Sequence, residues 1–262
     1  MINVAIHGAA GRMGRRLVAL THEDEALRLV AALEGEGSSE LGRDAGVLAG
    51  VGEVGVTITS ELEGEVDVVV DFSVQQAVGR LVGICRERKT ALVIGTTGLT
   101  ADDERAIDEA SREIPVLQAP NMSLGVNLLF VLAGQIAQRL GEEYDIEVIE
   151  AHHRFKQDAP SGTAMGLVKS ICDATGKDIV KDVKHGRSGM DPRRPGEIGV
   201  HALRLGDEVG RHTVCYGTLG EEVRITHTAS TRDTFVKGAL RAAKWLVDKP
   251  AGRYSMKDVL GL

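Results

Sequence analysis

The chain contains few aromatic residues and few cysteines. Phe, Trp and Tyr make up 3% of its 262 residues, so its cores are expected to be built from Val, Leu, Ile and Ala. The three cysteines, Cys85, Cys172 and Cys215, lie far apart and show no CxxC or CxxH spacing. We interpret them as buried free thiols of a protein from a reducing compartment, and we expect a cytoplasmic location.

An excess of positive charge and a long apolar segment are also absent. The net charge is -7, which argues against a nucleic-acid partner held through its phosphates. The longest apolar run, at residues 124–133, is interrupted by Asn127 and is too short to span a bilayer, and the first residues contain no signal-peptide core. We therefore expect no nucleic acid and no membrane as partners, and local basic groups for any anionic substrate.

The first half of the chain alternates between short apolar strands and amphipathic helices. Strands are predicted at residues 2–7, 27–33, 66–73, 91–94 and 116–118, with a helix at 75–88 and a capping box formed by Thr100 and Asp103. This alternation predicts a Rossmann-like, doubly wound parallel sheet. The Gly-rich residues 35–55 are expected to form a loop.

The pattern changes after about residue 123. An apolar helix is predicted at 123–140, a strand at 144–150, and a helix that begins at the N-cap Ser161 and ends at Gly176. Three strands at 197–205, 209–217 and 222–229 are expected to form an antiparallel meander before a last helix at 234–247. The overall prediction is an α/β domain followed by an α+β domain with a mainly antiparallel sheet.

A glycine-rich turn between the first strand and the first helix is the first candidate site. It carries Gly8, Gly11 and Gly14, but Ala10 replaces the middle glycine of the strict G-x-G-x-x-G pattern. Glu34 ends the next strand about 20 residues later, where an acid can accept hydrogen bonds from the adenosine ribose. The context favours a dinucleotide site, and a glycine turn without a nucleotide is the alternative.

Two later turns follow successive strands of the same predicted sheet. They are Gly95-Thr96-Thr97-Gly98 and Ala119-Pro120-Asn121-Met122. In open α/β sheets, ligands bind at the carboxyl ends of the strands, so these turns could support the nicotinamide half of a dinucleotide. Ordinary turn chemistry is the alternative reading.

The segment Glu150–Ala164, EAHHRFKQDAPSGTA, is the most specific feature of the second half. Histidine can exchange a proton near neutral pH, and the Pro-Ser-Gly-Thr turn opens a helix whose N–H groups favour an anion. These residues predict a pocket that holds a carboxylate and protonates the bound molecule. Adjacent side chains of an extended segment point to opposite faces, and no further Cys or His is near in sequence, so no metal is expected.

Taken together, these motifs resemble the 4-hydroxy-tetrahydrodipicolinate reductase (dihydrodipicolinate reductase) family. The resemblance rests on GAAGRMGR at 8–15, DFS at 71–73, GTTG at 95–98, Asn121, the segment 150–164 and the THTASTRDTF tract, in order along the whole chain. It implies reduction of the cyclic imine substrate by NADH or NADPH, with loss of water, in diaminopimelate and lysine biosynthesis. It also implies a dinucleotide-binding domain at 1–122 plus 234–262, and a substrate-binding domain at 123–233 that builds a homotetramer.

The resemblance also assigns roles to individual residues. His152 is implied as the proton donor and Lys156 as a second one, and His153, Gly162 and Thr163 are implied to contact the substrate. The implied cofactor contacts are Gly8, Ala9, Ala10, Gly11, Arg12, Met13, Glu34, Gly95, Thr96, Thr97, Ala119, Pro120, Asn121 and Met122.

Two positions depart from the family pattern. Phe155 stands where a further histidine is common, and Gly35 stands where some members place an arginine that meets the 2′-phosphate of NADPH. We therefore expect an enzyme that prefers NADH or accepts both cofactors, although Arg12 or Arg16 could compensate. The basic residues of the loop at 184–196 are interpreted as solvated, with a cover over the substrate as the alternative.

Two other functions remain open at this stage. Another two-domain NAD(P)-dependent oxidoreductase would share the first domain without needing HHxxK beside PSGTA. A dinucleotide sensor without catalysis would use the glycine turn alone, but it would not need a proton donor.

Overall fold

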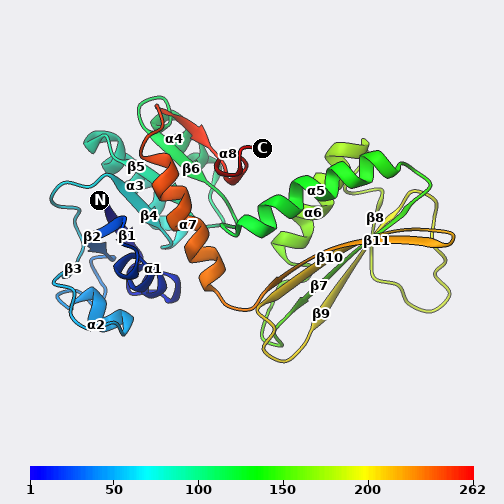
Figure 1. Cartoon of the computed structure of the whole chain (residues 1–262), viewed down its shortest axis with the longest axis horizontal. Coiled ribbons are helices and arrows are strands. Elements are labelled where there is room, and N and C mark those ends of the chain that lie inside the picture. The colour runs from blue at the N-terminus through cyan, green and yellow to red at the C-terminus, as the bar shows by residue number, and fades with distance from the viewer. The chain divides into compact units, whose positions relative to one another are not determined.

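The computed structural model describes all residues from 1 to 262. It divides into two compact units, the first formed by Met1–Leu124 with Asp233–Leu262 and the second by Gly125–Arg232 (Figure 1). The boundaries expected from the sequence lie within two residues of these. None of the helices combines the length and the apolar character that crossing a membrane requires.

The first unit is built on a parallel sheet of seven strands, as the alternation of strands and helices predicts. The strand order is β12-β6-β5-β4-β1-β2-β3, and every neighbouring pair is parallel. The order reverses between β1 and β4, which makes this the topological switch point where doubly wound sheets bind ligands. The strands are β1 (Ile2–His7), β2 (Leu27–Leu33), β3 (Ile58–Thr59), β4 (Val68–Asp71), β5 (Ala91–Ile94), β6 (Pro115–Gln118) and β12 (Gly252–Tyr254).

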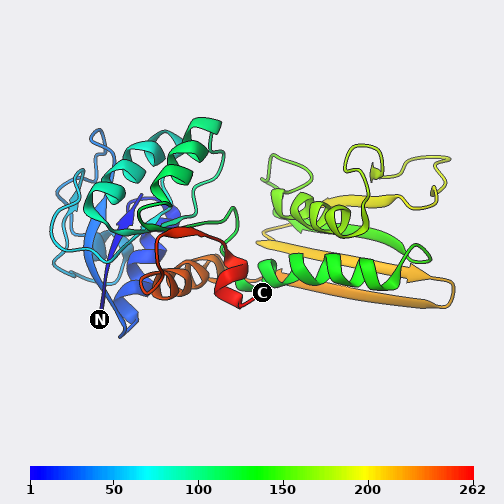
Figure 2. The same cartoon turned by 90° about the horizontal axis from the view of Figure 1, so that it is seen from above.

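Helices cover both faces of this sheet (Figure 2). One core contains residues of α1 (Arg12–Glu23), α7 (Asp233–Leu246) and α8 (Met256–Leu260). The other contains residues of α3 (Gln75–Arg88) and α4 (Ala101–Ala110), and α4 begins with the expected capping box. The Gly-rich stretch is not entirely loop, because Asp44 accepts from the N–H groups of Gly46 and Val47 and so starts the short helix α2 (Ala45–Ala49).

The second unit has a five-stranded sheet with one face covered by two helices. The strand order is β11-β10-β7-β9-β8, and Figure 1 shows α5 (Leu124–Leu140) and α6 (Gly162–Thr175) on the same side of it. Alternate residues of the strands, such as Val148 and Tyr216, pack against these helices in one core. The strands are β7 (Asp145–His152), β8 (Val183–His185), β9 (Ile198–Arg204), β10 (Gly210–Thr218) and β11 (Glu221–Ala229).

The predicted three-strand antiparallel meander is wrong. Only β10 and β11 form an antiparallel hairpin, and β10 pairs next with β7. Strand β9 is parallel to both β7 and β8, because the chain crosses over through α6 before it returns to the sheet. The sheet is therefore mixed, and β7 lies at its centre.

Candidate active site

A buried carboxylate lies at the end of the central strand of the second unit. The alternation of β7 turns Ile146, Val148 and Glu150 toward the helices, and Glu150 is 0% exposed. The register places His212 of β10 directly opposite Glu150, and Arg204 of β9 opposite His152. Three strands thus bring ionisable side chains to one end of this sheet.

Glu150 binds three partners at once. Arg204 donates to both carboxylate oxygens at 2.9 and 3.0 Å, and the Ser161 N–H donates at 3.0 Å. Nδ1 of His152 lies 2.6 Å from Oε2. Burial would raise the pKa of Glu150, but the hydrogen bonds from Arg204 and His152 outweigh it and hold that pKa below its usual value.

The ionised carboxylate fixes the tautomer of His152. A carboxylate can only accept, so Nδ1 of His152 carries the proton of the shared hydrogen bond. Nε2 is then the nitrogen that can exchange a proton with another molecule. This is the arrangement that a general acid or base requires.

The start of α6 is fixed by the same group of side chains. Ser161 is the N-cap, and its hydroxyl accepts from the Ala164 N–H at 3.1 Å. Nε2 of His212 lies 2.9 Å from that hydroxyl, and the N–H of Gly162 has no partner in the chain. Because N–H groups at a helix N-terminus favour an anion, this turn can hold a carboxylate.

His212 is a neutral histidine of this cluster. It is 4% exposed, and its ring meets that of His152 edge-on at 5.1 Å between centroids. Burial and the nearby His152 lower the pKa of His212 to about 4. His212 therefore serves as an uncharged hydrogen-bonding partner of Ser161 at neutral pH.

The remaining residues of the segment 150–164 differ in their surroundings. Nζ of Lys156 lies 2.7 and 2.9 Å from the carboxylate oxygens of Asp158, and the charge of Lys156 contributes to the lowered pKa of His212. Nδ1 of His153 is buried without a hydrogen-bond partner. Phe155, the departure from the family pattern, is 73% exposed.

Sequence reasoning gave no role to three members of this cluster: Glu150, Arg204 and His212. A signal for two of them was available, because Glu150 and His212 occupy core-facing positions of strands whose other inward residues are apolar. Buried charged or polar groups need partners, so such positions point to a site. Nothing comparable marked Arg204, whose place depends on the pairing of β9 with β7.

The glycine turn of the first unit has the shape that a pyrophosphate requires. Gly8 has φ +79°, and a Cβ there would lie 2.6 Å from the Phe72 carbonyl oxygen. A Cβ at Gly14 would overlap the Gly8 carbonyl, so α1 can approach the turn only with glycine at this position. Gly11 is the N-cap of α1 and offers no side chain to its first N–H groups, which fits a bound phosphate.

The acid and the arginines around this turn have distinct partners. Glu34 accepts from the Ala10 N–H at 2.7 Å, and Arg15 donates to the Ala10 carbonyl at 2.7 Å. Arg16 is held by two hydrogen bonds of 2.8 Å to Asp233. Of Arg12, Arg15 and Arg16, only Arg12 has no side-chain hydrogen bond or ion pair. The space around Gly35 is open, because a Cβ there would meet nothing within 4 Å.

The two later turns contribute mainly backbone. Ala119 and Met122 are 4% and 2% exposed and belong to the core. Asn121 accepts from the Ser123 N–H at 2.9 Å. The hydroxyl of Thr96 donates to the buried carboxylate of Asp71 at 2.6 Å.

The basic residues of the loop at 184–196 differ in their surroundings: acids hold Arg187 and Arg193, whereas His185 is exposed and the side chain of Arg194 is 65% exposed. Arg187 binds Glu147 and Glu197, and Arg193 binds Asp145 and Glu147. Burial would raise the pKa of Glu197, but hydrogen bonds from Arg187 and Arg194 bring it down to about 2. Because Glu147 precedes His152 by five strand residues, about 16 Å, these pairs do not cover the histidine.

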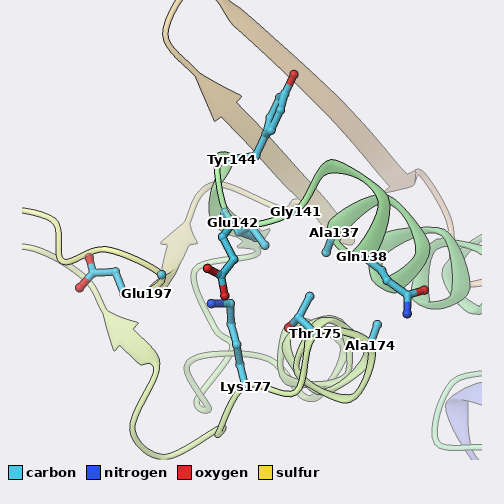
Figure 3. Close-up of a pocket in the computed structure, with 11 residues that line it drawn as sticks. Ala137, Gln138, Gly141, Glu142, Tyr144, Ala174, Thr175, Lys177 and Glu197 are labelled. Atoms are coloured by element: carbon cyan, nitrogen blue, oxygen red, sulfur yellow. The ribbon is translucent and has the colours of Figure 1, made fainter.

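A cavity of about 230 Å³ lies near the other end of β7, between the C-terminal ends of α5 and α6 (Figure 3). Its lining includes Ala137, Ile146, Thr175 and Lys177. No residue that the sequence predicted for a site lines it.

Comparisons with known proteins agree on one family. Residues 2–122 match the description "Dihydrodipicolinate reductase, N-terminus" and residues 125–260 match "Dihydrodipicolinate reductase, C-terminus". A relative from Alkalilimnicola ehrlichii, named 4-hydroxy-tetrahydrodipicolinate reductase, is 48% identical over 99% of this chain and 98% of its own length. A relative of the same name from Syntrophotalea carbinolica is 46% identical over 100% of both chains.

Solved structures show the same likeness. The dipicolinate-bound dihydrodipicolinate reductase from Paenisporosarcina sp. TG-14 is 25% identical, covers 97% of both chains and has a TM-score of 0.78. A probable dehydrogenase from Thermotoga maritima, 12% identical with a TM-score of 0.60, shares the fold.

The first unit has a parallel sheet with a glycine turn at its switch point, and the second unit has a histidine held on a buried carboxylate. Together with the family match, these features define an oxidoreductase of the Rossmann type that uses a nicotinamide cofactor. The relatives narrow this class to one reaction of diaminopimelate and lysine biosynthesis. The chain belongs to the dihydrodipicolinate reductase family.

Proposed function

We propose that the protein reduces 4-hydroxy-tetrahydrodipicolinate to tetrahydrodipicolinate with loss of water, and that His152 supplies the proton. The observation that carries this proposal is the 2.6 Å contact between Nδ1 of His152 and the buried, arginine-bound carboxylate of Glu150. Because Nδ1 is bound to Glu150, Nε2 is the only ring nitrogen of His152 that can exchange a proton with the substrate.

The chemistry needs one hydride and one proton for each substrate. Bound nicotinamide supplies the hydride. Addition to the conjugated imine left after water is lost puts an electron pair on the substrate, and the proton on Nε2 of His152 neutralises it. Glu150 stabilises the imidazolium before transfer, and solvent then restores the proton.

The substrate is a dicarboxylate, and the start of α6 suits one of its carboxylates. We assign Gly162 and Thr163 to that contact, because they follow the N-cap Ser161 on a helix whose geometry is held by Glu150 and His212. Lys156 provides a nearby cation, offsetting the desolvation of the bound anion and serving as the second proton donor. His153, with its unpartnered buried Nδ1, is assigned to the substrate as well.

The first unit would hold the cofactor through its turns. The backbone from Gly8 to Met13 and the N-terminus of α1 suit the pyrophosphate, and Glu34 suits the adenosine ribose. Residues 95–97 and 119–122 would support the nicotinamide half mainly through their backbone.

We further propose that NADH is preferred or that both cofactors are accepted. Glu34 would repel a 2′-phosphate, and Gly35 offers no charge to bind one. Arg16 is committed to Asp233, so Arg12 is the one arginine left to compensate. The test compares kcat/KM for NADH and NADPH, and a large NADPH advantage would refute this preference.

The variant Gly35→Arg sharpens the cofactor test. The open space at Gly35 accepts a side chain, and one charge-assisted contact is worth about 10–100-fold in affinity. We expect a rise of that size in kcat/KM for NADPH. Gly37→Arg, also in open space two residues on, is the matched control and should leave the ratio near wild type.

The open face of the second sheet supports a homotetramer. Helices cover only the face that carries Val148 and Tyr216, while residues such as Thr213 and Thr226 occupy the other face of adjoining strands. Light scattering behind size exclusion tests this assembly, and a monomer at micromolar concentration would refute it. The three free cysteines fit a cytoplasmic setting.

The activity itself is tested by NADH oxidation at 340 nm with substrate generated in situ from pyruvate and aspartate semialdehyde. We expect oxidation that requires both precursors. Oxidation with unrelated carbonyl compounds alone would point to another dehydrogenase. Tight cofactor binding without any turnover would point to a sensor.

A further inference from the structure

Asp71, Phe72 and Ser73 form a motif at the switch point of the first unit to which the catalytic proposal gives no task. Asp71 is the last residue of β4 and is 0% exposed. Its register partners are His7 at the end of β1 and Ile94 at the end of β5. The carboxylate therefore lies where the strand order reverses and where both proposed cofactor turns begin.

Both oxygens of the Asp71 carboxylate have hydrogen-bond partners, and these partners come from three strand ends. Nδ1 of His7 lies 2.7 Å from Oδ1, and the Ser73 hydroxyl lies 2.6 Å from the same atom. The Thr96 hydroxyl donates to Oδ2 at 2.6 Å and accepts from the Ser73 N–H at 3.0 Å. No lysine or arginine forms an ion pair with Asp71, and the one ionisable side chain within hydrogen-bond distance of its carboxylate is His7.

Phe72, between these two residues, contacts the same two turns. Its carbonyl oxygen is the atom that a Cβ on Gly8 would meet, and its ring is what a Cβ on Gly95 would overlap. The motif thus lies between the start of the glycine turn and the start of the turn at 95–97. A shift of either turn would break a hydrogen bond to Asp71 or a contact with Phe72.

This geometry limits what Thr96 can do for a cofactor. Its side chain is committed to Asp71 and Ser73, and the residue is 7% exposed. The hydroxyl is therefore used inside the protein. Only the backbone of Thr96 is left to face a bound molecule.

We propose that Asp71, with His7 and Ser73, is a positioning group for the nicotinamide cofactor that ties the turn at 95–97 to the glycine turn. This rests on the proposed assignment of both turns to the cofactor. Thr96 then acts through the carboxylate of Asp71, and its hydroxyl makes no direct contact with the cofactor.

The test measures binding by isothermal titration calorimetry with the full chain and two probes, NADH and ADP-ribose, which lacks the nicotinamide. Thr96→Val removes the hydroxyl at constant shape, and we expect NADH Kd to rise about 10-fold, the worth of one hydrogen bond to a charged group. ADP-ribose Kd should stay within about twofold. Thr96→Ser, which keeps the hydroxyl, should bind NADH like wild type.

A double-mutant cycle tests whether Thr96 acts through Asp71. Asp71→Asn should raise NADH Kd at least as much as Thr96→Val, and the double variant should be no worse than Asp71→Asn alone, because both remove the same tether. Asp67→Asn is the matched control at the exposed residue just before β4, where Asp67 accepts from the Asn3 N–H, and it should bind like wild type.

The outcomes separate this inference from the proposed function. If wild type binds neither NADH nor NADPH, the cofactor assignment fails. If wild type binds NADH but Thr96→Val binds it equally well, or if both probes weaken equally, positioning of the nicotinamide half is refuted. Additive losses in the cycle would refute the tether. If Asp71→Asn does not fold, the pair Thr96→Val and Thr96→Ser decides the question.

Discussion

The two units each bury one carboxylate at the end of a central strand, and each carboxylate holds a histidine by Nδ1. Asp71 in the first unit and Glu150 in the second are both 0% exposed. The histidine contacts are 2.7 Å for His7 and 2.6 Å for His152. A buried carboxylate bound to Nδ1 of a histidine therefore occurs in two sheets of different topology.

The two carboxylates differ in what balances their charge. Glu150 is bound on both oxygens by Arg204, a cation at every physiological pH. Asp71 has hydroxyl partners and His7 alone. The difference fits two proposed tasks: the permanent charge pair would hold the proposed proton donor His152, while the set of short hydrogen bonds would hold backbone turns in place.

The largest expected effect separates these tasks. Glu150→Gln removes the charge that fixes and stabilises His152, so kcat should fall by about 10²-fold or more, with NADH Kd unchanged. Asp71→Asn should instead raise NADH Kd about 10-fold. Steady-state rates at saturating NADH and calorimetric titration measure the two quantities. If Glu150→Gln raised the NADH Kd as much as Asp71→Asn, the two carboxylates would not have separate tasks in catalysis and cofactor binding.

A second prediction concerns the countercharge itself. Arg204→Met leaves Glu150 buried without its cation, which should lower the free energy of unfolding by about 3–5 kcal/mol. Arg224→Met on β11 breaks an exposed pair with Glu222 and should cost about 1 kcal/mol or less. Urea unfolding measures the free energy of unfolding of both variants. Equal losses of stability would show that Arg204 stabilises the protein no more than an exposed arginine does, although its partner Glu150 is buried.

The neutral histidine of the second unit predicts a pH dependence. The folded-state pKa of His212 is about 4, below the 6.5 of a free histidine. Between these values the unfolded chain binds the extra proton, so the free energy of unfolding falls as the pH is lowered from 6.5 to 4, by on the order of 3 kcal/mol. His212→Gln, which can still bind Ser161, should flatten this slope. An unchanged slope would show that His212 is not the group responsible.

The smallest expected effects come from the two serines beside the carboxylates. Ser161→Ala removes the cap of α6 and should cost about 1 kcal/mol of stability, with a severalfold higher KM for the substrate. Ser73→Ala should raise NADH Kd severalfold and leave the substrate KM unchanged. If both variants altered the same constant, the two clusters would not be independent.

Local patterns carried most of the fold prediction. The strands and helices of the first unit follow from apolar runs and caps such as Thr100 with Asp103, and their alternation fixes parallel pairing. The second sheet was mispredicted because the pairing of β7 with β9 joins residues about 50 apart. Such pairing depends on the crossover through α6, which no local pattern encodes.

The residues of the candidate site also fall into those that local sequence reveals and those that only strand pairing brings together. His152 and Ser161 could be found because their chemistry is concentrated in one segment of sequence. Glu150 lies two residues before His152 in the same segment, but Arg204, the cation that binds Glu150, reaches it only through strand register. His7 and Asp71 likewise meet across β1 and β4, so their contact could not be read from either segment alone.

We propose above that His152, held on the charged carboxylate of Glu150, supplies the proton of the reduction. The most direct measurement is kcat of His152→Gln in the 340 nm assay, beside calorimetric NADH binding by the same variant. We predict a fall in kcat of about 10²–10⁴-fold, with NADH Kd within about twofold of wild type. Wild-type turnover by the variant would contradict the claim.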